Sequence, residues 1–503
     1  MTIKTCEWNS LDPRQRRSVL RRPAVADDGR VRDGTSAIIS EVRSDGDRAL
    51  LRLTARYDGA EMDTLKVTEQ EIAAAASQLP QAAVDAIDLA IANVRRFHEA
   101  QQPEAIAVET MPGVLCERVS HAIDAVGLYV PAGTAPLPSA AIMLAVPAAI
   151  AGCPVRVLCT PPRPDGTADP AVLVAATRAG VTDIYKVGGA QAVAAMAYGT
   201  ESVPKVGKIF GPGNSWVTCA KTLVSADPEG AAIDMPAGPS EVLVIADDEA
   251  SAEFVASDLL AQAEHGVDSQ VLLVSTSARL GAAVVQEIET QLATLSRADI
   301  ARGALANSRI VTVNSLDEAV AVSNQYAPEH LILQVANPRP LLASIRNAGS
   351  VFVGQWTPES VGDYCSGTNH VLPTYGYAKN YSGLGVDQPP QQGGQRRGGR
   401  GFEDQSARRV ASPGPGTRSA AAPQHAARGA HTRVEAGDVP LHGGGTLAGV
   451  LGAAVEQRRA DDRPGRHVLA GGDVRWMTLE VGVVIGGAVG GIEMGGEPAE
   501  AVR

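Results

Sequence analysis

Hydrophobic positions change their spacing along the chain. Between residues 35 and 100, apolar side chains such as Ile87, Ile91 and Val94 recur every three to four positions, which predicts helices. From Val126 onward, short runs of β-branched residues alternate with helical segments, the pattern of a parallel sheet covered by helices. The chain is therefore predicted to be an α/β protein with a helical N-terminal segment.

Two successive sets of strands are predicted, joined near residues 230–239. The first set covers residues 126–130, 155–160, 183–187 and 208–210, and the second covers 242–246, 271–275, 309–313, 331–335 and 351–353. Two similar α/β halves are the simplest architecture for this order. The predicted boundaries are residues 1–112 for the helical N-terminal region, 113–238 and 239–387 for the two α/β domains, and 388–503 for an atypical tail.

Local signals fix the ends of two helices. One helix should begin after Asp169 as N-cap, with Pro170 in its first position, and end before Gly180. A later helix should open with a capping box, in which Ser315 and Glu318 satisfy each other's backbone amides.

Composition narrows the class of function. The 503 residues exceed what one hydrophobic core supports, and the formal charge of −12 disfavours a nucleic-acid partner. No stretch has the run of apolar residues that a membrane-spanning helix needs, so a cytoplasmic small-molecule enzyme without a membrane partner is expected. The six cysteines lack metal-binding spacing and are interpreted as buried free thiols, namely Cys6, Cys116, Cys153, Cys159, Cys219 and Cys365.

The composition shifts abruptly after Asp387. Residues 388–503 hold 24 of the 52 glycines and 14 arginines, but no Lys, Asn, Tyr or Cys. We interpret this segment as mostly disordered, and as the product of translation in a wrong reading frame of GC-rich DNA. A natural low-complexity tail is an alternative. RNA binding through the Arg/Gly-rich start is a third interpretation, which the balancing acidic residues disfavour.

Four glycine-containing loops follow the predicted strands, where open parallel sheets bind ligands. They cover residues 131–136, 188–191, 211–214 and 236–240. Glycines allow backbone amides to approach a ligand, and the following helix N-termini favour phosphate. None has the Gly-x-Gly-x-x-Gly pattern, and each is also compatible with a plain turn.

Polar residues suggest a metal site. Gln262 and His265 are spaced to share one helical face and could offer an oxygen and a nitrogen to one ion. Alternatively, His265 is a cation placed favourably at a helix C-terminus. Asp363 lies in a long polar loop, residues 357–370, where it could be a further ligand or a turn former.

Glu329 and His330 place a carboxylate beside an imidazole just before a strand, where both can reach one cleft. A solvated polar turn is the alternative. Only five histidines precede the tail, and three of them (His265, His330 and His370) fall in these polar segments. This concentration favours a functional site.

Taken together, these motifs resemble those of the histidinol dehydrogenase family. They are VGLYVP at 126–131, GGAQA at 188–192, KIFGPGN at 208–214, DMPAGPSE at 234–241, QAEH at 262–265, YAPEHL at 326–331 and GDYCSGTNH at 362–370. They occur in the family's order, and the resemblance extends from about residue 7 to Asp387.

The resemblance implies two incomplete Rossmann-like, aldehyde-dehydrogenase-like domains in a domain-swapped homodimer. It implies oxidation of L-histidinol to L-histidine through the aldehyde, with two NAD molecules and one zinc ion per subunit. The implied roles are zinc binding for Gln262, His265 and Asp363, NAD contact for Tyr129, Gln191 and Asn214, substrate contact for Ser240 and the zinc-site residues, and catalysis with substrate contact for Glu329 and His330.

The implied chemistry suits these residue types. Zinc would anchor the imidazole and amine of histidinol and orient its alcohol carbon. His330, with a near-neutral pKa, would accept the hydroxyl proton, and Glu329 would activate water for attack on the aldehyde. A thiohemiacetal route through Cys116 or Cys153 ranks lower, because no base lies near either in sequence.

The sequence departs from the family after Asp387. The family's C-terminal segment carries a Glu and a His into the neighbouring subunit's site, whereas here the chain continues as Gln388-Pro389-Pro390. Weak zinc binding and weak activity are expected for this polypeptide. The alternatives are an impaired homologue that still binds NAD or histidinol, a zinc hydrolase using Glu329 and water, and an Arg/Gly-tail interaction protein.

Overall fold

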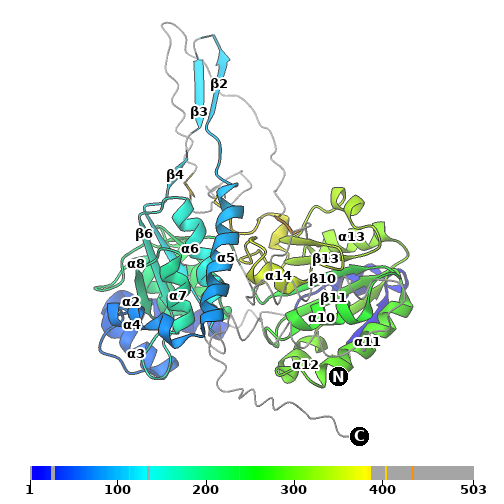
Figure 1. Ribbon diagram of the computed structural model, residues 1–503, viewed down its shortest axis with the longest axis horizontal. Coiled ribbons are helices and arrows are strands. Elements are labelled where there is room, and N and C mark those ends of the chain that lie inside the picture. Colours follow the sequence, from blue (N-terminus) through cyan, green and yellow to red (C-terminus); the bar gives the residue numbers. More distant parts are fainter. Residues whose placement is uncertain are drawn as a thin grey trace.

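The computed structural model describes residues 3–23, 29–112, 114–118, 120–132, 136–236 and 238–386, with the short segments 403–404 and 432–434. Two lobes lie side by side, and each is built on a parallel sheet (Figure 1). We call them the first lobe and the second lobe, in chain order. This architecture confirms the predicted α/β fold.

The first lobe contains a five-stranded parallel sheet in the order β7-β6-β5-β8-β9. Its strands are β5 (Ala125–Tyr129), β6 (Val155–Thr160), β7 (Asp183–Lys186), β8 (Lys208–Phe210) and β9 (Ala232–Ile233). One face is covered by α5 (Gln81–Glu99), α6 (Pro138–Ile150) and α7 (Pro170–Arg178), and α4 (Glu69–Ala75) packs on α7. The other face is covered by α2 (Gly29–Asp45), α3 (Asp47–Tyr57), α8 (Gly189–Tyr198) and α9 (Ser215–Ala226). The predicted N-terminal helices are thus present and pack against the first sheet.

The second lobe contains a seven-stranded parallel sheet in the order β1-β12-β11-β10-β13-β14-β16. Its strands are β1 (Lys4–Glu7), β10 (Glu241–Ala246), β11 (Gln270–Ser275), β12 (Arg309–Thr312), β13 (His330–Gln334), β14 (Ser350–Val353) and β16 (Thr432–Val434). The helices of one face are α10 (Ala252–Ala263), α11 (Ala278–Leu292) and α12 (Ala298–Ala306), and those of the other are α13 (Leu316–Tyr326) and α1 (Pro13–Val19); α14 (Glu359–Tyr364) packs against α10.

The N-terminal strand β1 pairs with β12, so the first residues of the chain belong to the sheet of the second lobe. Sequence analysis predicted only helix before residue 112 and missed this strand. Its four residues are too few to show a clear alternation, and three of them are exposed. The chain therefore begins in the second lobe, enters the first, and returns.

The two helix starts have different outcomes. Asp169 caps α7 by accepting from the amides of Ala171 and Val172, with Pro170 in the first turn, as predicted. The predicted capping box of α13 is wrong in one half. The Ser315 hydroxyl accepts from the Glu318 amide, but the Glu318 carboxylate accepts from the amide of Asn314 instead of that of Ser315.

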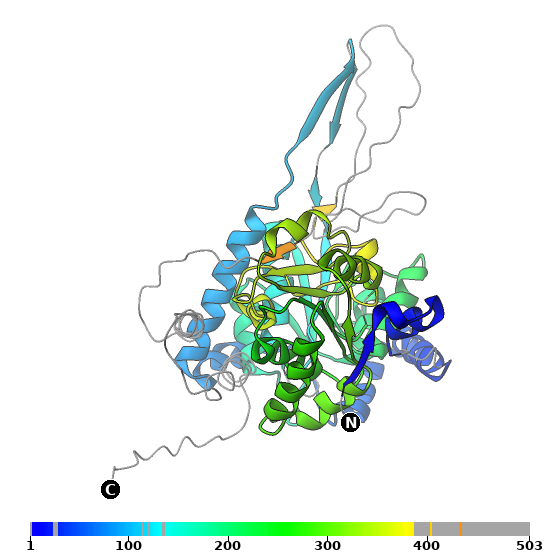
Figure 2. The ribbon, with the colours of Figure 1, turned by 90° about the vertical axis from the view of Figure 1, so that its right-hand side faces the viewer.

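A hairpin of β2 (Ile106–Met111) and β3 (Val114–Arg118) projects far from the first lobe (Figure 2). It exposes the apolar side chains of Ile106, Val108 and Met111. Cys116 is exposed on it as well, so the expectation of buried thiols is wrong there, whereas Cys153, Cys159 and Cys365 are buried and all six thiols are free. The remaining short elements are β4 (His121–Ala122), β15 (Glu403–Asp404), η1 (Trp8–Ser10), η2 (Ala76–Gln78), η3 (Arg339–Ala343) and η4 (Tyr377–Lys379).

The predicted disorder of the tail lies outside the described residues, apart from β15, which pairs with β4, and β16. Among the described helices, none combines the length and the apolar character that a membrane span requires.

The segment after α14 returns to the first lobe. Asn93 of α5 donates to the carbonyl of Cys365 over 2.8 Å, and the Asn369 amide donates to the carbonyl of Met143 in α6 over 2.8 Å. Val371 and Leu384 are buried in the core of the first lobe. These contacts fix the polar segment 357–370 where the two lobes meet.

Candidate active site

The paired acid and imidazole lie at the amino ends of the central strands of the second sheet. Glu241 is the first residue of β10 and His330 the first of β13, and Val242 is the register partner of His330. The next three residues of each strand are apolar and fully buried, so the centre of the sheet lies in the core and these polar residues lie at its edge. This site therefore lies at the amino edge of its sheet, opposite the edge at which parallel sheets usually bind ligands.

Both members of the pair are buried: Glu329 is 5% exposed and His330 is 4% exposed. A carboxylate oxygen of Glu329 accepts from the Glu241 amide over 2.9 Å. His330 Nδ1 lies 3.2 Å from the Glu241 carbonyl oxygen and 2.9 Å from Oε1 of Gln262. These contacts exclude the alternative of a solvated polar turn.

The contacts of His330 determine its tautomer. A carbonyl oxygen only accepts, so Nδ1 must carry the proton, and the neutral ring leaves Nε2 as its acceptor. Nε2 is buried, has no hydrogen-bond partner within the described part of the chain, and lies 3.7 Å from Oδ1 of Asp363. The nitrogen of His330 that carries the unused lone pair is thus the one near the carboxyl group of Asp363, which sequence analysis had proposed as a metal ligand.

Burial shifts the pKa values of His330 and Glu329. Desolvation, with His265 and His370 as lesser causes, lowers the pKa of His330 to about 3, against the opposing effect of the Glu241 carbonyl. The expectation of a near-neutral pKa is therefore wrong for this structure, although the ring is unprotonated as a base must be. Desolvation also raises the pKa of Glu329 well above its usual range.

Two further carboxyl groups complete the cluster. Glu359, the first residue of α14, has an oxygen 3.7 Å from His330 Nδ1, and both its carboxyl oxygens are buried without a hydrogen-bond partner among the described residues. Burial raises the pKa of Glu359, with neighbouring Asp363 as the next cause, and burial raises that of Asp363 to about 7. Sequence analysis missed Glu359, although it lies in the same polar segment as Asp363.

The segment 357–370 was predicted to be a loop, but its residues 359–364 form α14. The helix turns Glu359 and Asp363, four residues apart, toward the same side. This spacing is the signal that could have identified Glu359 in the sequence.

The proposed zinc ligands are only partly brought together. Gln262, on α10, is fully buried, with Nε2 unpartnered among the described residues, and it meets Asp363 around His330. His265 lies beyond the end of α10 at Ala263, in a turn closed by its amide on the Gln262 carbonyl, so it does not share a helical face with Gln262. The side chain of His265 remains exposed, and it lies near enough to His330 and His370 that its protonated form lowers the pKa of both.

These donors fit a divalent cation in kind. Amide oxygen, imidazole and carboxylate are all zinc ligands, and a cation would compensate the buried carboxylates. Within the ranges that the structure describes, no group of three or more His, Cys, Asp or Glu side chains could hold a metal ion. An ion at this site would therefore depend on the Gln262 amide or on a donor outside these ranges.

The three predicted cofactor residues lie at the carboxyl edge of the first sheet. Tyr129 ends β5, and its hydroxyl accepts from the Gly189 amide over 3.1 Å. Gln191 is buried in the first turn of α8. Asn214 caps α9 by accepting from two amides, and it remains exposed. Ser240, the proposed substrate contact, is partly buried immediately before β10.

A buried ion pair supports the loop before Asn214. Lys221 donates to Asp234 over 2.5 Å and to the Gly211 carbonyl over 2.8 Å, and Asp234 accepts from the Gly211 amide. Sequence analysis missed this pair, because its partners come from a helix and a loop with no local pattern that links them.

Residues 20–389 match the family model described as histidinol dehydrogenase. A histidinol dehydrogenase of Xanthomonas oryzae pv. oryzae is 58% identical over 384 residues, which are 76% of this chain and 89% of the relative. One from Vibrio vulnificus is 54% identical over the same length, with 76% and 88% covered. A crystal structure of histidinol dehydrogenase from Elizabethkingia anophelis superposes with a TM-score of 0.73 at 44% identity, covering 76% of this chain and 88% of that one.

Proposed function

The chain belongs to the histidinol dehydrogenase family, and on this premise we propose that it oxidises L-histidinol to L-histidine through L-histidinal, with NAD as oxidant. This places it in histidine biosynthesis, as a cytoplasmic oxidoreductase. The observation that carries the proposal is the buried His330: its Nδ1 lies 3.9 Å from a carboxyl oxygen of Glu329, and its Nε2 has no hydrogen-bond partner among the described residues.

His330 and Glu329 are the proposed catalytic residues. With Nδ1 held by the Glu241 carbonyl, His330 can take the alcohol proton only at Nε2. The raised pKa of Glu329 makes its ionised form a stronger base, which suits removal of a proton from the water that attacks the aldehyde. NAD, when bound, accepts a hydride in each of the two oxidation steps.

Tyr129, Gln191 and Asn214 are the proposed NAD contacts. All three border loops at one edge of the first sheet, and two of them lie in the first turn or at the N-cap of a helix, where backbone dipoles favour phosphate. Tyr129 and Gly189 already hold two of these loops together.

Gln262, His265 and Asp363 are the residues that we propose to hold zinc, with Ser240 nearby for the substrate. The unpartnered carboxyl oxygens of Glu359 and the raised pKa of Asp363 support a cation at this site. When bound, the ion supplies an anchor for the imidazole and amine of histidinol, and it orients the alcohol carbon.

We propose a homodimer as the functional assembly. The projecting hairpin exposes the apolar side chains of Ile106, Val108, Met111 and Leu115, and such clusters of exposed apolar residues mark interaction surfaces. Nucleic acid is not a proposed partner, in line with the negative charge of the chain.

One observation favours a second candidate function, an impaired homologue that binds NAD or histidinol without turnover. The family match ends at residue 389, and the chain covers 89% of the Xanthomonas relative. The family resemblance implies a C-terminal segment that completes the site, and such a segment would lie beyond the matched part.

The experiment is a steady-state assay of the purified full chain with histidinol and NAD. We expect histidinol-dependent NADH formation, with two NADH per histidine produced. Binding of both ligands with no NADH would instead establish the impaired homologue. Product release without NAD would point to hydrolysis and overturn the proposal.

A further inference from the structure

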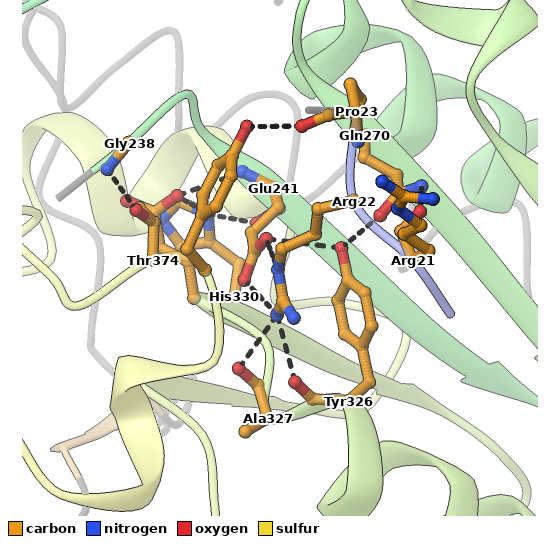
Figure 3. Close-up of polar contacts among 12 residues, drawn as sticks. Arg21, Arg22, Pro23, Gly238, Glu241, Gln270, Tyr326, Ala327, His330 and Thr374 are labelled. Atoms are coloured by element: carbon orange, nitrogen blue, oxygen red, sulfur yellow. Dashed lines mark hydrogen bonds and ion pairs between the residues drawn. The ribbon is translucent and has the colours of Figure 1, made fainter. Parts of the chain in front are cut away.

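Arg22 joins the N-terminal segment to β10, the strand whose first residue, Glu241, contacts both Glu329 and His330 (Figure 3). Its Nε donates to one carboxylate oxygen of Glu241 over 2.5 Å, and Nη2 donates to the other over 2.7 Å. The same Nη2 donates to the carbonyl oxygens of Tyr326 and Ala327 over 2.9 and 3.3 Å. The guanidinium also lies 3.9 Å from the centre of the Tyr326 ring. One side chain thus fixes β10 and the end of α13 together.

Glu241 carries this constraint to the catalytic pair. Its side chain, 1% exposed, is held by Arg22 and by the Tyr326 hydroxyl. Its main chain holds the pair directly, because its amide donates to Glu329 and its carbonyl accepts from His330 Nδ1. Movement of the Glu241 carboxylate would therefore shift the backbone groups that orient both side chains.

Ala327 provides a second connection between Arg22 and the pair formed by Glu329 and His330. This residue is left-handed, with φ of 57°, a conformation that is unfavourable for a residue with a side chain. It lies two residues before Glu329, and Arg22 binds its carbonyl and the preceding one. The guanidinium therefore stabilises the turn that places Glu329 and His330 at the edge of the sheet.

We propose that Arg22 is a positioning residue for the oxidation, which sets the orientation of Glu329 and His330 through Glu241 and the turn at Ala327. The inference rests on the proposed function only for the roles of Glu329 and His330. A merely structural alternative is that Arg22 anchors the N-terminal segment to the second lobe.

Arg16 supplies a matched control for that alternative. It lies on the same N-terminal segment, in α1, where Nε donates to the Trp8 carbonyl and the guanidinium lies 5.0 Å from the Trp8 ring. It also donates to Asn9. Arg16→Gln therefore weakens the packing of the segment without removing a contact to Glu241.

The test compares Arg22→Gln, Arg22→Lys and Arg16→Gln in the full chain. We expect Arg22→Gln to lower kcat roughly 10- to 100-fold, the cost of misplacing reacting groups, with the KM for NAD unchanged. Arg22→Lys should recover only part of the loss, since an ammonium cannot bind the carboxylate in bidentate fashion. Arg16→Gln should keep the original kcat.

Arg22→Gln leaves Glu241 buried without its cation and is therefore expected to lose stability. The double variant Arg22→Gln/Glu241→Gln removes that charge. We expect the double variant to fold more stably than Arg22→Gln and to keep the low kcat. Recovery of full kcat in the double variant would overturn the positioning role.

A nitrogen NMR spectrum of histidine-labelled protein gives a readout independent of turnover, with the His330 signals assigned by their loss in His330→Asn. Arg22→Gln should shift those signals and Arg16→Gln should not. If the His330 signals and kcat are both unchanged in Arg22→Gln, Arg22 only anchors the N-terminal segment to the second lobe, and the positioning role is overturned. If the original chain oxidises no histidinol but the His330 signals still respond to Arg22, the proposed function fails while the positioning contact stands.

Discussion

His330 Nδ1 lies 3.2 Å from the carbonyl oxygen of Glu241, and this contact decides which imidazole nitrogen can act as a base. Nδ1 has to donate to that carbonyl, so proton transfer is assigned to Nε2. Since Glu241 also donates its amide to Glu329, a single residue of β10 orients both proposed catalytic groups.

The first prediction separates the two nitrogens. His330→Asn keeps an N–H near the position of Nδ1, which can still donate to Glu241, but removes the acceptor at Nε2. We expect kcat to fall roughly 10²- to 10⁴-fold, the usual contribution of a general base, with little change in thermal stability. Steady-state kinetics and thermal unfolding check this expectation.

His98→Asn is the matched control. His98 is equally buried, with Nδ1 on the Val94 carbonyl at 2.8 Å, but it lies in α5 and has no proposed catalytic role. This variant should lose stability and keep kcat among folded molecules. Equal losses of kcat in the two variants would show that burial of a histidine, rather than its chemistry, explains the effect.

Much of the fold could be predicted from the sequence, because buried strands appear in it as short runs of apolar residues. The buried strands β5, β6, β10, β11 and β13 are mainly apolar, and all were predicted within one or two residues. β1 was missed because an exposed four-residue edge strand has no such run. Its position depends on β12, which lies about three hundred residues later.

Some features of the candidate site could likewise be predicted from the sequence, and others could not. Glu329, His330, Gln262 and Asp363 could be selected because their motifs are local, and the structure brings them together. The contribution of Arg22 could not be predicted, since its contacts to Glu241 join residues 219 positions apart. The pKa of His330 was also inaccessible, because it depends on burial by segments from throughout the chain.

Asp58 should make stability depend on pH. Burial raises its pKa from 3.8 to about 6, and Oδ2 has no hydrogen-bond partner among the described residues. A folded-state pKa above the unfolded one favours folding of the protonated form, so this contribution is complete below 3.8 and is lost as the pH rises through 6. Asp58→Asn should therefore stabilise the protein at about pH 8, by roughly 1 kcal/mol after allowance for partial exposure, and have little effect at about pH 4.

Asp165 provides a control of opposite sign. Hydrogen bonds from Thr167 lower its pKa, so its ionised form favours folding. Asp165→Asn should lower the melting temperature at about pH 8 and have less effect at low pH. An Asp58→Asn variant that is destabilised at about pH 8 would contradict the assignment of a desolvated carboxylate.

Gly211 should tolerate no side chain. Its φ is +127°, and an added Cβ would lie 2.2 Å from the Tyr129 carbonyl oxygen, between β5 and the loop before Asn214. We expect Gly211→Ala to cost more than about 2 kcal/mol of stability and to weaken NAD binding, because the proposed cofactor loops must separate. Gly152→Ala is the control, since its φ is +80° but nothing lies within 4 Å of the added carbon. It should cost only about 1 kcal/mol, and NAD titration should not distinguish it from the original chain.

Metal removal should stop turnover reversibly. We expect chelation to abolish NADH formation and zinc to restore it, since the proposed ion anchors the substrate. Asp363→Asn should weaken zinc binding more than roughly 10-fold. The control Asp299→Asn, at an exposed position of α12, should leave zinc binding unchanged. Zinc content after dialysis against graded chelator measures the difference. Full activity in chelated protein that is free of zinc would exclude the ion from the reaction.

The last prediction concerns the chain beyond the family match, which ends at residue 389. In a chimera, residues 390–503 are replaced by the corresponding C-terminal segment of the Xanthomonas relative. The family resemblance implies that this segment brings a histidine into the neighbouring subunit's zinc site, and an added ligand should raise zinc affinity, kcat and the dimer fraction together. Deleting residues 390–503 without replacement is the control, and it should behave like the full chain. Sedimentation, zinc titration and steady-state kinetics measure the three effects. If the deletion variant oxidises histidinol and the chimera is no better in all three, residues 1–389 already contain everything the site uses, and the impaired-homologue alternative would lose its support.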